Sequence, residues 1–376
     1  MSSLSSNCIV GQKRAKAQIE AWLKSRRVPH TILISGPPGV GKRRLALELV
    51  KAINCRQVSG WACGRCNSCI KVEKLLHPDV HMLLPLQSGR EKQDRAAAQE
   101  VMRGAVLDYL QRGTAFYHSN VNIARDFIRT LQKDMVYTPV EAPCRIGVIF
   151  EAECMHPAGA NSLLKILEEP PENAFFILVS ALPEKILPTV LSRCQQVALQ
   201  GLGQAELRAY LQGMDISAEN LELAVRLGRG SIQRALQIAA GELDGMRDSV
   251  EQFILAGMRG EDAVYWSLLE EVGSSAERGK LEEFLECCGL YLRDLMLLAC
   301  GDEAKIACAD RRDFLMQVRH SFQLDQLEAL AVEVDRAFEN LWRNVSTNLV
   351  LADLWRCLGN CERWSGALSV AGGAQN

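Results

Sequence analysis

The sequence predicts an α/β fold with a parallel sheet, followed by a largely helical region. Short apolar runs alternate with amphipathic helical stretches in residues 1–202, and a glycine-rich turn follows the first run. Such alternation is typical of a parallel sheet covered by helices on both faces. Leu, Ala, Glu and Arg at helical spacing then dominate. At about 150 residues per domain, 376 residues allow two to three domains. We expect an α/β domain at 1–202, a small helical domain at 203–245 and a larger one at 246–376.

The composition is that of an ordinary globular protein. The 43 Lys and Arg residues against 45 Asp and Glu residues give a net charge of -2, and 48% of the residues are hydrophobic. This balance argues against a broadly basic DNA-coating protein, although a local basic face remains open. No run approaches the ~18 apolar residues of a membrane span, and the first residues lack the pattern of a secretory signal. We therefore expect a cytoplasmic protein.

The elements of the α/β region follow in order along the chain. Residues 9–35 predict a helix and then a buried strand at Thr31–Ile34, and a helix follows the glycine-rich turn. The polar segment 86–120 is interpreted as an inserted surface segment. The later expected elements are a helix at 123–135, a strand at Ile146–Phe150, a helix at Asn161–Leu167 and a strand at Phe175–Val179.

The turn after the first strand has the spacing of a phosphate-binding P-loop. In such a loop, glycines let backbone N–H groups approach phosphate oxygens, and a lysine reaches the terminal phosphates. Here Lys42 is that lysine, and Arg43 stands where serine or threonine would ligate Mg²⁺. The candidate nucleotide-binding residues are Gly36, Pro37, Pro38, Gly39, Val40, Gly41, Lys42 and Arg43.

A second Mg²⁺ contact is also missing. The strand that should end in an Asp-Glu pair ends in Phe150 and Glu151, and phenylalanine has no oxygen for a metal-bound water. Glu151 could still polarise a water. The sequence therefore predicts no Mg²⁺ and no ATP hydrolysis by this chain, with the P-loop kept as a folding element. Binding of ATP or ADP without turnover stays open because Lys42 is present.

Four of the fourteen cysteines cluster with the spacing C-x7-C-x2-C-x2-C. Four thiolates at this spacing can close a tetrahedron around Zn²⁺ and leave no open position, which is typical of a structural site. Chance clustering is the alternative, and His77 and His81 are more distant substitute ligands. A knuckle that reads nucleic acid is also possible. The candidate ligands are Cys55, Cys63, Cys66 and Cys69, in a zinc module at residues 55–69.

Arg193 lies in a Ser-Arg-Cys triplet beyond the third predicted strand. An arginine on such a loop could contact the γ-phosphate of a nucleotide held by a neighbouring subunit. Taken alone, the residue carries no functional meaning, because most surface arginines are solvated charges or form salt bridges at the rim of an interface.

Together these motifs resemble the clamp-loader ATPases of the AAA+ superfamily, and among them the delta-prime subunits of bacterial DNA polymerase III. The resemblance covers most of residues 8–240. Its most specific parts are Leu163–Pro171 and the triplet around Arg193. The other matching parts are Ile9–Gln12, His30, the P-loop, the four cysteines and His77–Asp79.

The resemblance implies an AAA+ domain with an inserted zinc knuckle, a helical lid and a C-terminal collar that mediates oligomerisation. It also implies bound Zn²⁺ and an arginine finger, Arg193, that acts in trans. The implied partners are gamma/tau and delta subunits in a heteropentamer within the DNA polymerase III holoenzyme, which as a whole is a DNA-directed DNA polymerase. Through that complex they also include the sliding clamp and primed DNA during replication.

Departures from the family pattern separate two hypotheses. Residues 230–236 resemble the sensor-2 helix, but Gln233 stands where hydrolysing relatives place arginine, and Arg234 is one residue away. One residue turns a helical side chain by about 100°. With Arg43 and Phe150, this favours a delta-prime-type subunit that does not hydrolyse ATP. The alternative is an ATP-hydrolysing subunit of the gamma/tau type.

Overall fold

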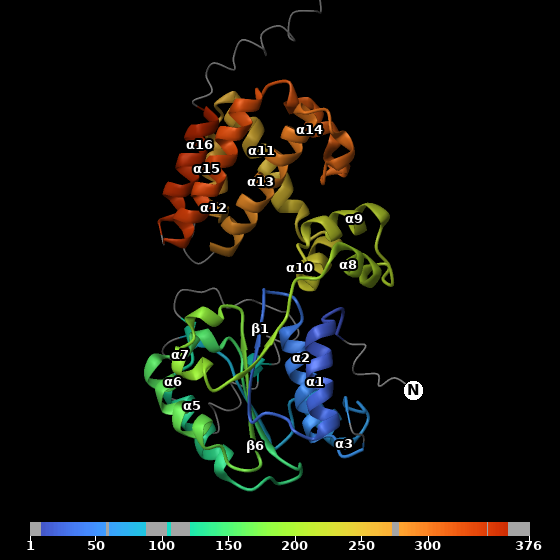
Figure 1. Cartoon of the computed structure of the whole chain (residues 1–376). Coiled ribbons are helices and arrows are strands. Elements are labelled where there is room, and N and C mark those ends of the chain that lie inside the picture. The colour runs from blue at the N-terminus through green and yellow to red at the C-terminus, as the bar shows by residue number, and fades with distance from the viewer. Residues whose placement is uncertain are drawn as a thin grey trace, which may run out of the picture. The chain divides into compact units, whose positions relative to one another are not determined.

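The computed structural model describes residues 9–57, 60–87, 104–106, 121–272, 278–343 and 345–359. These residues form two compact units (Figure 1). Of the described residues, the first unit contains those up to Met214 together with Gly228–Leu236, and the second contains Asp215–Leu227 and those from Gln237 to Gly359. The expected boundaries after residues 202 and 245 stay a prediction.

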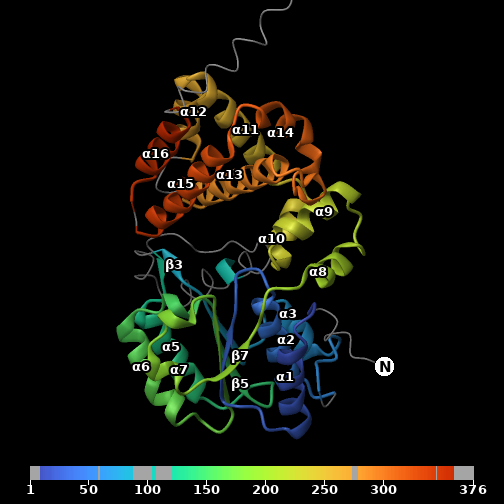
Figure 2. The same ribbon diagram turned by 45° about the horizontal axis from the view of Figure 1, so that its top comes forward.

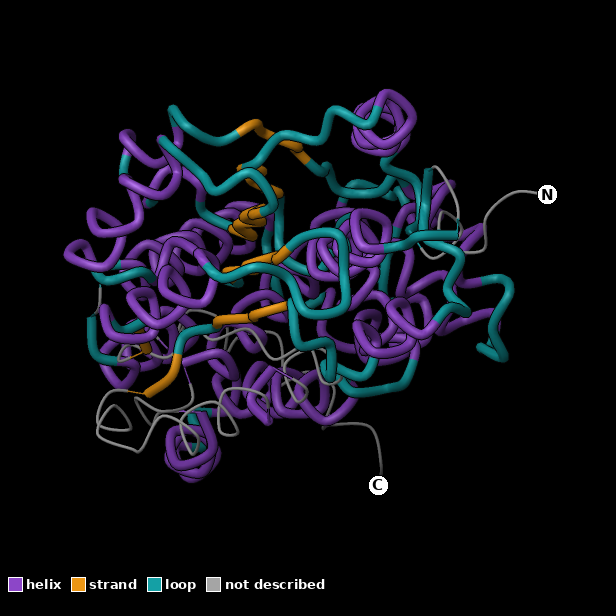
Figure 3. Tube along the Cα trace, turned by 90° about the horizontal axis from the view of Figure 1, so that it is seen from below, coloured by secondary structure: helices purple, strands orange, loops and turns teal. Residues whose placement is uncertain are grey.

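A five-stranded parallel sheet forms the centre of the first unit, with the strand order β2-β5-β6-β1-β7. In Figure 3 its strands, drawn orange, follow one another in a row. A separate antiparallel pair joins β3 to β4. The strands are β1 (Thr31–Ser35), β2 (Val80–Leu83), β3 (Leu86–Gln87), β4 (Val121–Asn122), β5 (Arg145–Ile149), β6 (Ala174–Ser180) and β7 (Gln195–Ala198).

The three inner strands were predicted and the two edge strands were not. Every residue of β1 and β5 is buried, as are all but one of β6, and each strand contains an apolar run that the sequence shows. At the edges, β7 has a single buried residue, and β2 is buried only at Leu83. An edge strand is covered on fewer sides, so its sequence carries no such run.

Helices cover both faces of this sheet, as the alternating pattern predicted (Figure 1). Helices α1 and α2 lie on one face, and α5 and α6 lie on the other. The helix expected at 123–135 begins at Arg125, and the one expected at 161–167 begins earlier, with Pro157 in its first turn. The helices are α1 (Lys13–Ser25), α2 (Lys42–Asn54), α3 (Asn67–Glu73), α5 (Arg125–Val136), α6 (Pro157–Glu168), α7 (Pro188–Leu191) and α8 (Gln204–Leu211).

The insertion expected at 86–120 falls mostly outside the described residues. Only its first two residues, in β3, and residues 104–106 are described.

The second unit consists of helices, as predicted for this part of the chain. Its long helix α13 packs beside α11 and α15, and α16 packs on α15 (Figure 2). No helix of the described residues is long and apolar enough to cross a membrane. Helix α10 (Ile232–Ala239) begins in the first unit and ends in the second. The other helices are α9 (Ala218–Leu227), α11 (Asp244–Arg259), α12 (Asp262–Val272), α13 (Arg278–Ala299), α14 (Arg312–Arg319), α15 (Leu324–Trp342) and α16 (Thr347–Gly359).

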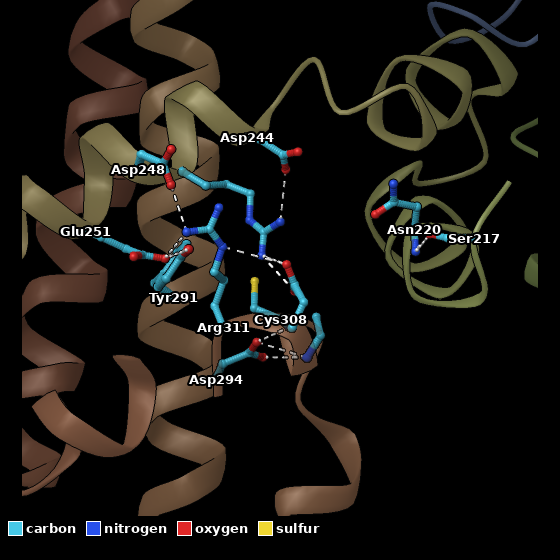
Figure 4. A network of polar contacts seen from close by, with 12 residues as sticks. Ser217, Asn220, Asp244, Asp248, Glu251, Tyr291, Asp294, Cys308 and Arg311 are labelled. Atoms are coloured by element: carbon cyan, nitrogen blue, oxygen red, sulfur yellow. Dashed lines mark hydrogen bonds and ion pairs between the residues drawn. The ribbon is translucent and has the colours of Figure 1, made fainter. Parts of the chain in front are cut away.

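A network of polar contacts fastens the loop before α14 to α11, and in it Arg311 pairs with Asp248 and Glu251 of α11 (Figure 4). Arg247 is 1% exposed and donates two hydrogen bonds to the carboxylate of Asp310, at 2.8 and 2.7 Å. Asp294 of α13 accepts hydrogen bonds from the backbone N–H groups of Ala307 and Cys308 in the same loop. A buried charge without its partner costs about 3–5 kcal/mol, so these contacts fix the loop strongly.

Candidate functional site

Two glycines shape the P-loop between β1 and α2. Gly36 has a φ of +148°, and a Cβ built on it would lie 2.4 Å from the carbonyl oxygen of Leu199. Gly39 has a φ of +73°, and its Cβ would lie 1.9 Å from Oγ of Ser231. Any side chain would collide at either position. The loop is therefore held between the end of β7 and the segment before α10.

The segment that resembles sensor 2 lies directly on the P-loop. The carbonyl oxygen of Gly39 accepts hydrogen bonds from the backbone N–H groups of Ile232 (3.0 Å) and Gln233 (3.4 Å). Ser231 caps the start of α10 by accepting from the backbone N–H of Arg234 at 3.2 Å. The structure thus brings this predicted segment and the P-loop together through backbone contacts.

Lys42 is buried and bonded to its own loop. Its Nζ donates to the carbonyl oxygens of Gly36 (2.7 Å) and Pro37 (2.8 Å), and the residue is 6% exposed. Burial lowers the pKa of Lys42 to about 8, with the negative charge of Glu151 opposing the shift and the positive charge of Arg43 adding to it. A phosphate would compete with two carbonyl groups for this ammonium.

Arg43 and Glu151 form an ion pair beside the P-loop. Their Nη and Oε atoms are 3.6 Å apart, and the side chains are 22% and 16% exposed. Phe150 precedes Glu151 and is completely buried in the core. The guanidinium stands where a Mg²⁺ ligand should be and neutralises the carboxylate that remains. These residues therefore do not fit Mg²⁺.

Glu153 has a different role from Glu151. Its Oε1 accepts hydrogen bonds from the backbone N–H groups of Ala181 (3.0 Å) and Leu182 (3.3 Å), just after β6. Burial raises the pKa of Glu153, and the nearby charge of Glu151 adds to the rise. This side chain fixes the turn at the end of β6.

The four predicted cysteines converge between α2 and α3. Their Sγ atoms all lie within 4.8 Å of one another, and those of Cys63 and Cys69 are 3.9 Å apart. A tetrahedron with Zn–S bonds of about 2.3 Å has edges of about 3.8 Å, so the arrangement fits a four-thiolate metal site. The cluster could therefore bind a metal such as zinc. A chance clustering of cysteines along the sequence would not bring all four sulfur atoms together in this way.

Backbone N–H groups point at the sulfur atoms of this cluster. Cys66 N–H donates to Sγ of Cys63 (3.3 Å), and Cys69 N–H donates to Sγ of Cys66 (3.5 Å). Burial favours the neutral thiol of Cys63, but backbone hydrogen bonds, including that of Arg65, outweigh it and lower the pKa to about 6. Burial raises the pKa of Cys69. A bound cation would favour the thiolate form of all four cysteines.

The two histidines considered as substitute ligands have other contacts. His77 Nδ1 accepts from the backbone N–H of Asp79 at 3.2 Å, and His81 Nε2 lies 3.3 Å from a guanidinium nitrogen of Arg145. Neither belongs to the group of four sulfur atoms.

Asp79 fastens the loop before β5 beside the cysteine cluster. Its buried carboxylate accepts hydrogen bonds from the backbone N–H groups of Val140 (2.6 Å), Glu141 (2.7 Å) and Ala142 (2.8 Å). Lys71 of α3 in turn contacts the carboxylate of Glu141 at 2.5 Å. The loop and the cysteine-bearing segment are thus joined by the ion pair of Lys71 with Glu141.

Arg193 follows α7 and lies near the C-terminal end of α6. One guanidinium nitrogen donates to the carbonyl oxygen of Thr189 at 2.7 Å, and the other contacts the carboxylate of Glu168. The side chains of Arg193 and Glu168 are 31% and 50% exposed. The charge is therefore accessible to solvent and held by a partner that is more exposed still.

Sequence reasoning missed the acidic partners of both arginines. Glu151 was considered only for activating water, and Glu168 only as part of the end of a helix. Arg43 in place of a Mg²⁺ ligand could have indicated its pairing with Glu151, because both motif positions border the same nucleotide site. Glu168 lies 25 positions from Arg193, and no local pattern links them.

A family model described as "DNA polymerase III, delta subunit" matches residues 11–203, which span the sheet, the P-loop, the cysteines and Arg193. The chain belongs to this family. It is thus a member of the DNA polymerase III clamp-loader family that its motifs resemble, as the sequence predicted.

Individual members of the family and related subunits show different extents of similarity. DNA polymerase III subunit gamma/tau of Mycobacterium tuberculosis is 31% identical over 248 residues, which cover 64% of this chain and 37% of that protein. DNA polymerase III subunit delta' of Bacillus subtilis is 23% identical over 317 residues, covering 84% of this chain and 85% of that protein. A gamma subunit-related protein of Thermotoga maritima superposes with a TM-score of 0.44 at 15% identity, covering 91% and 99% of the two chains.

Proposed function

We propose that this chain is the delta-prime-type subunit of a DNA polymerase III clamp loader. It does not hydrolyse ATP itself and supplies Arg193 to ATP bound by a neighbouring gamma/tau-type subunit. Its partners are gamma/tau and delta subunits in a heteropentamer. In the cytoplasm, that complex would load the sliding clamp onto primed DNA during replication.

The ion pair between Arg43 and Glu151 is the observation that carries this proposal. Hydrolysis by a P-loop protein needs Mg²⁺ to neutralise charge on the transferred phosphoryl group. Here a guanidinium stands at one ligand position and a buried phenylalanine at the other, while the remaining carboxylate is paired. Coverage supports the same assignment, since the Bacillus subtilis delta' subunit matches along most of both chains.

The alternative function is ATP hydrolysis of the gamma/tau type. It is favoured by sequence identity, which is 31% with the mycobacterial gamma/tau protein against 23% with the delta' protein. That match, however, leaves 63% of the mycobacterial protein uncovered, since only 37% is covered. The residues at the Mg²⁺ positions favour the delta-prime role.

Steady-state ATP hydrolysis by the purified chain, with MgCl₂ present, tests the proposal directly. We expect no turnover above that of a Lys42→Ala variant, because Arg43 and Phe150 replace the two usual Mg²⁺ ligands and Glu151 is paired with Arg43. Measurable turnover that Lys42→Ala abolishes would refute the proposal and favour the gamma/tau type.

We also propose that Zn²⁺ occupies the cysteine cluster as a structural ion. Metal analysis of the purified chain should find one zinc per chain, and Cys66→Ser should lose most of it because three thiolates remain. Cys154→Ser serves as the matched control, since Cys154 lies outside the cluster. A metal-free wild-type chain, folded by circular dichroism, would contradict this assignment.

The helical region is proposed to divide into a lid at 203–245 and an oligomerisation domain, the collar, at 246–376. The contacts that hold residues 230–233 on the P-loop suit a lid that adjoins a nucleotide site. The packed helices of the second unit suit a collar.

A further inference from the structure

In this P-loop, the guanidinium of Arg43 stands at the position that usually supplies a ligand to Mg²⁺. Arg43 is the second residue of α2, and Glu151 follows β5 and its buried Phe150. An arginine stays charged at every physiological pH and presents planar N–H donors that match phosphate oxygens. It therefore both repels Mg²⁺ and offers the positive charge that the ion would supply.

We propose that this P-loop binds a nucleoside di- or triphosphate without a divalent cation, with the Arg43 guanidinium taking the place of Mg²⁺. The inference rests on the non-hydrolysing role proposed above and adds the class of ligand and its metal independence. Glu151 then acts as a counter-ion that holds the guanidinium beside the loop when no phosphate is present.

Three features of the loop support an anionic ligand. Lys42 and Arg43 are consecutive at the start of α2, where the helix dipole adds positive potential. At Gly41, whose φ is +96°, no described atom beyond its chain neighbours lies within 4 Å of the position that a Cβ would occupy, so the backbone there is open to a ligand. Lys42 bonds to two neutral carbonyl groups, which a charged phosphate can replace with stronger contacts.

The exchange at Arg43 is also feasible. Its distance of 3.6 Å from Glu151 is longer than a charge-assisted hydrogen bond of about 2.7–2.9 Å. A phosphate with two or more negative charges therefore competes well with one carboxylate at this distance. Because the guanidinium is part of the chain, chelation of metal ions cannot remove it.

Calorimetric titration of the full-length chain with ADP, in MgCl₂ or in excess EDTA, tests the proposal. We expect dissociation constants that agree within about twofold in the two conditions, and loss of the signal in Lys42→Ala. Arg43→Thr restores a hydroxyl ligand, so its affinity in EDTA should fall about tenfold and recover in part with Mg²⁺. Glu151→Gln, the matched variant of the pair, should keep metal-independent binding at equal or higher affinity.

Three results would each overturn the inference. The first two are no ADP binding by the wild type at millimolar concentration, and binding that Mg²⁺ strengthens by more than about tenfold. Undiminished binding by Arg43→Ala in EDTA would do the same. Circular dichroism and metal content show whether each variant is folded. A metal requirement leaves the non-hydrolysing role intact, whereas that role fails on turnover by the isolated chain.

Discussion

The P-loop cations and Arg193 differ in what surrounds their charges. Lys42 is buried and bonded to carbonyl groups of its own loop, and Arg43 is mostly buried beside Glu151. Arg193 is 31% exposed, and its acidic partner Glu168 is half exposed. A charge that is compensated inside the protein gives up its partner only to a ligand of higher charge, such as a phosphate, while a charge whose partner is solvated can exchange that partner at little cost. The difference teaches that the surroundings of a basic side chain decide whether it serves the P-loop of this chain or is available to a neighbouring subunit. Substitutions at Arg193 and at the P-loop each test this comparison.

The largest expected effect is that of Arg193→Ala on hydrolysis by the assembled complex. In a complex whose only competent ATP site adjoins this chain, we expect a rate about 10³-fold lower, as for other arginine fingers. Arg193→Lys should recover only part of the rate, because lysine lacks the planar fork. Lys185→Ala, which removes an exposed cation from the turn after β6, is the control. An unchanged rate in Arg193→Ala, with intact assembly by gel filtration, would remove the finger role.

A smaller effect is expected at the P-loop as the pH rises. The pKa of Lys42 is about 8 without ligand, and a bound phosphate should raise it. Between about pH 7 and 8 the ammonium is mostly charged in both states, so Lys42 adds little pH dependence to the affinity for ADP. Above pH 8 the free chain must take up a proton to bind, and affinity should fall by up to about tenfold per pH unit.

Lys42→Arg is the control for this pH dependence. Arginine stays charged throughout this range, so its ADP affinity should not fall between pH 8 and about 10. A wild-type affinity that is flat over the same range would mean that Lys42 does not bind the phosphate.

The smallest effect is expected for the partner of the finger. Arg193 must leave Glu168 to reach a neighbouring triphosphate, and an exposed ion pair is worth about 0.2–1 kcal/mol. Glu168→Gln should therefore raise hydrolysis at the adjoining site by up to about fivefold, while Glu169→Gln should not change it. A fall in rate would indicate that Glu168 orients Arg193 for its task instead of restraining it.

Sequence reasoning predicted the parts of the molecule that depend on local patterns. The inner strands β1, β5 and β6 each contain an apolar run, and the four cysteines lie within 15 positions of one another, so the sequence predicted both the strands and the cluster. The edge strands β2 and β7 lack such runs because they are partly exposed. Their presence follows from pairing with β5 and β1, which is a tertiary property.

The sequence predicted which residues of the candidate site depart from the motifs, but it did not predict which residues they pair with. Arg43 and Phe150 were recognised as departures because a motif defines what should stand there. The ion pairs of Arg43 with Glu151 and of Arg193 with Glu168 join distant segments. Likewise, the contact of Ser231 with Gly39 depends on how the chain returns to the P-loop, which no spacing encodes.

The carboxylate of Asp79 has a consequence for the molecule in acid. Burial works to raise its pKa, but hydrogen bonds from three successive backbone amides and the charge of Arg145 outweigh this and lower it. Its stabilising contribution is present above the ordinary pKa of an aspartate and is lost as the pH falls through the lowered value. A single protonation there would weaken three hydrogen bonds at once. The segment 140–142 would thus lose its attachment to Asp79 in one cooperative step. The ion pair between Glu141 and Lys71 would be weakened with it.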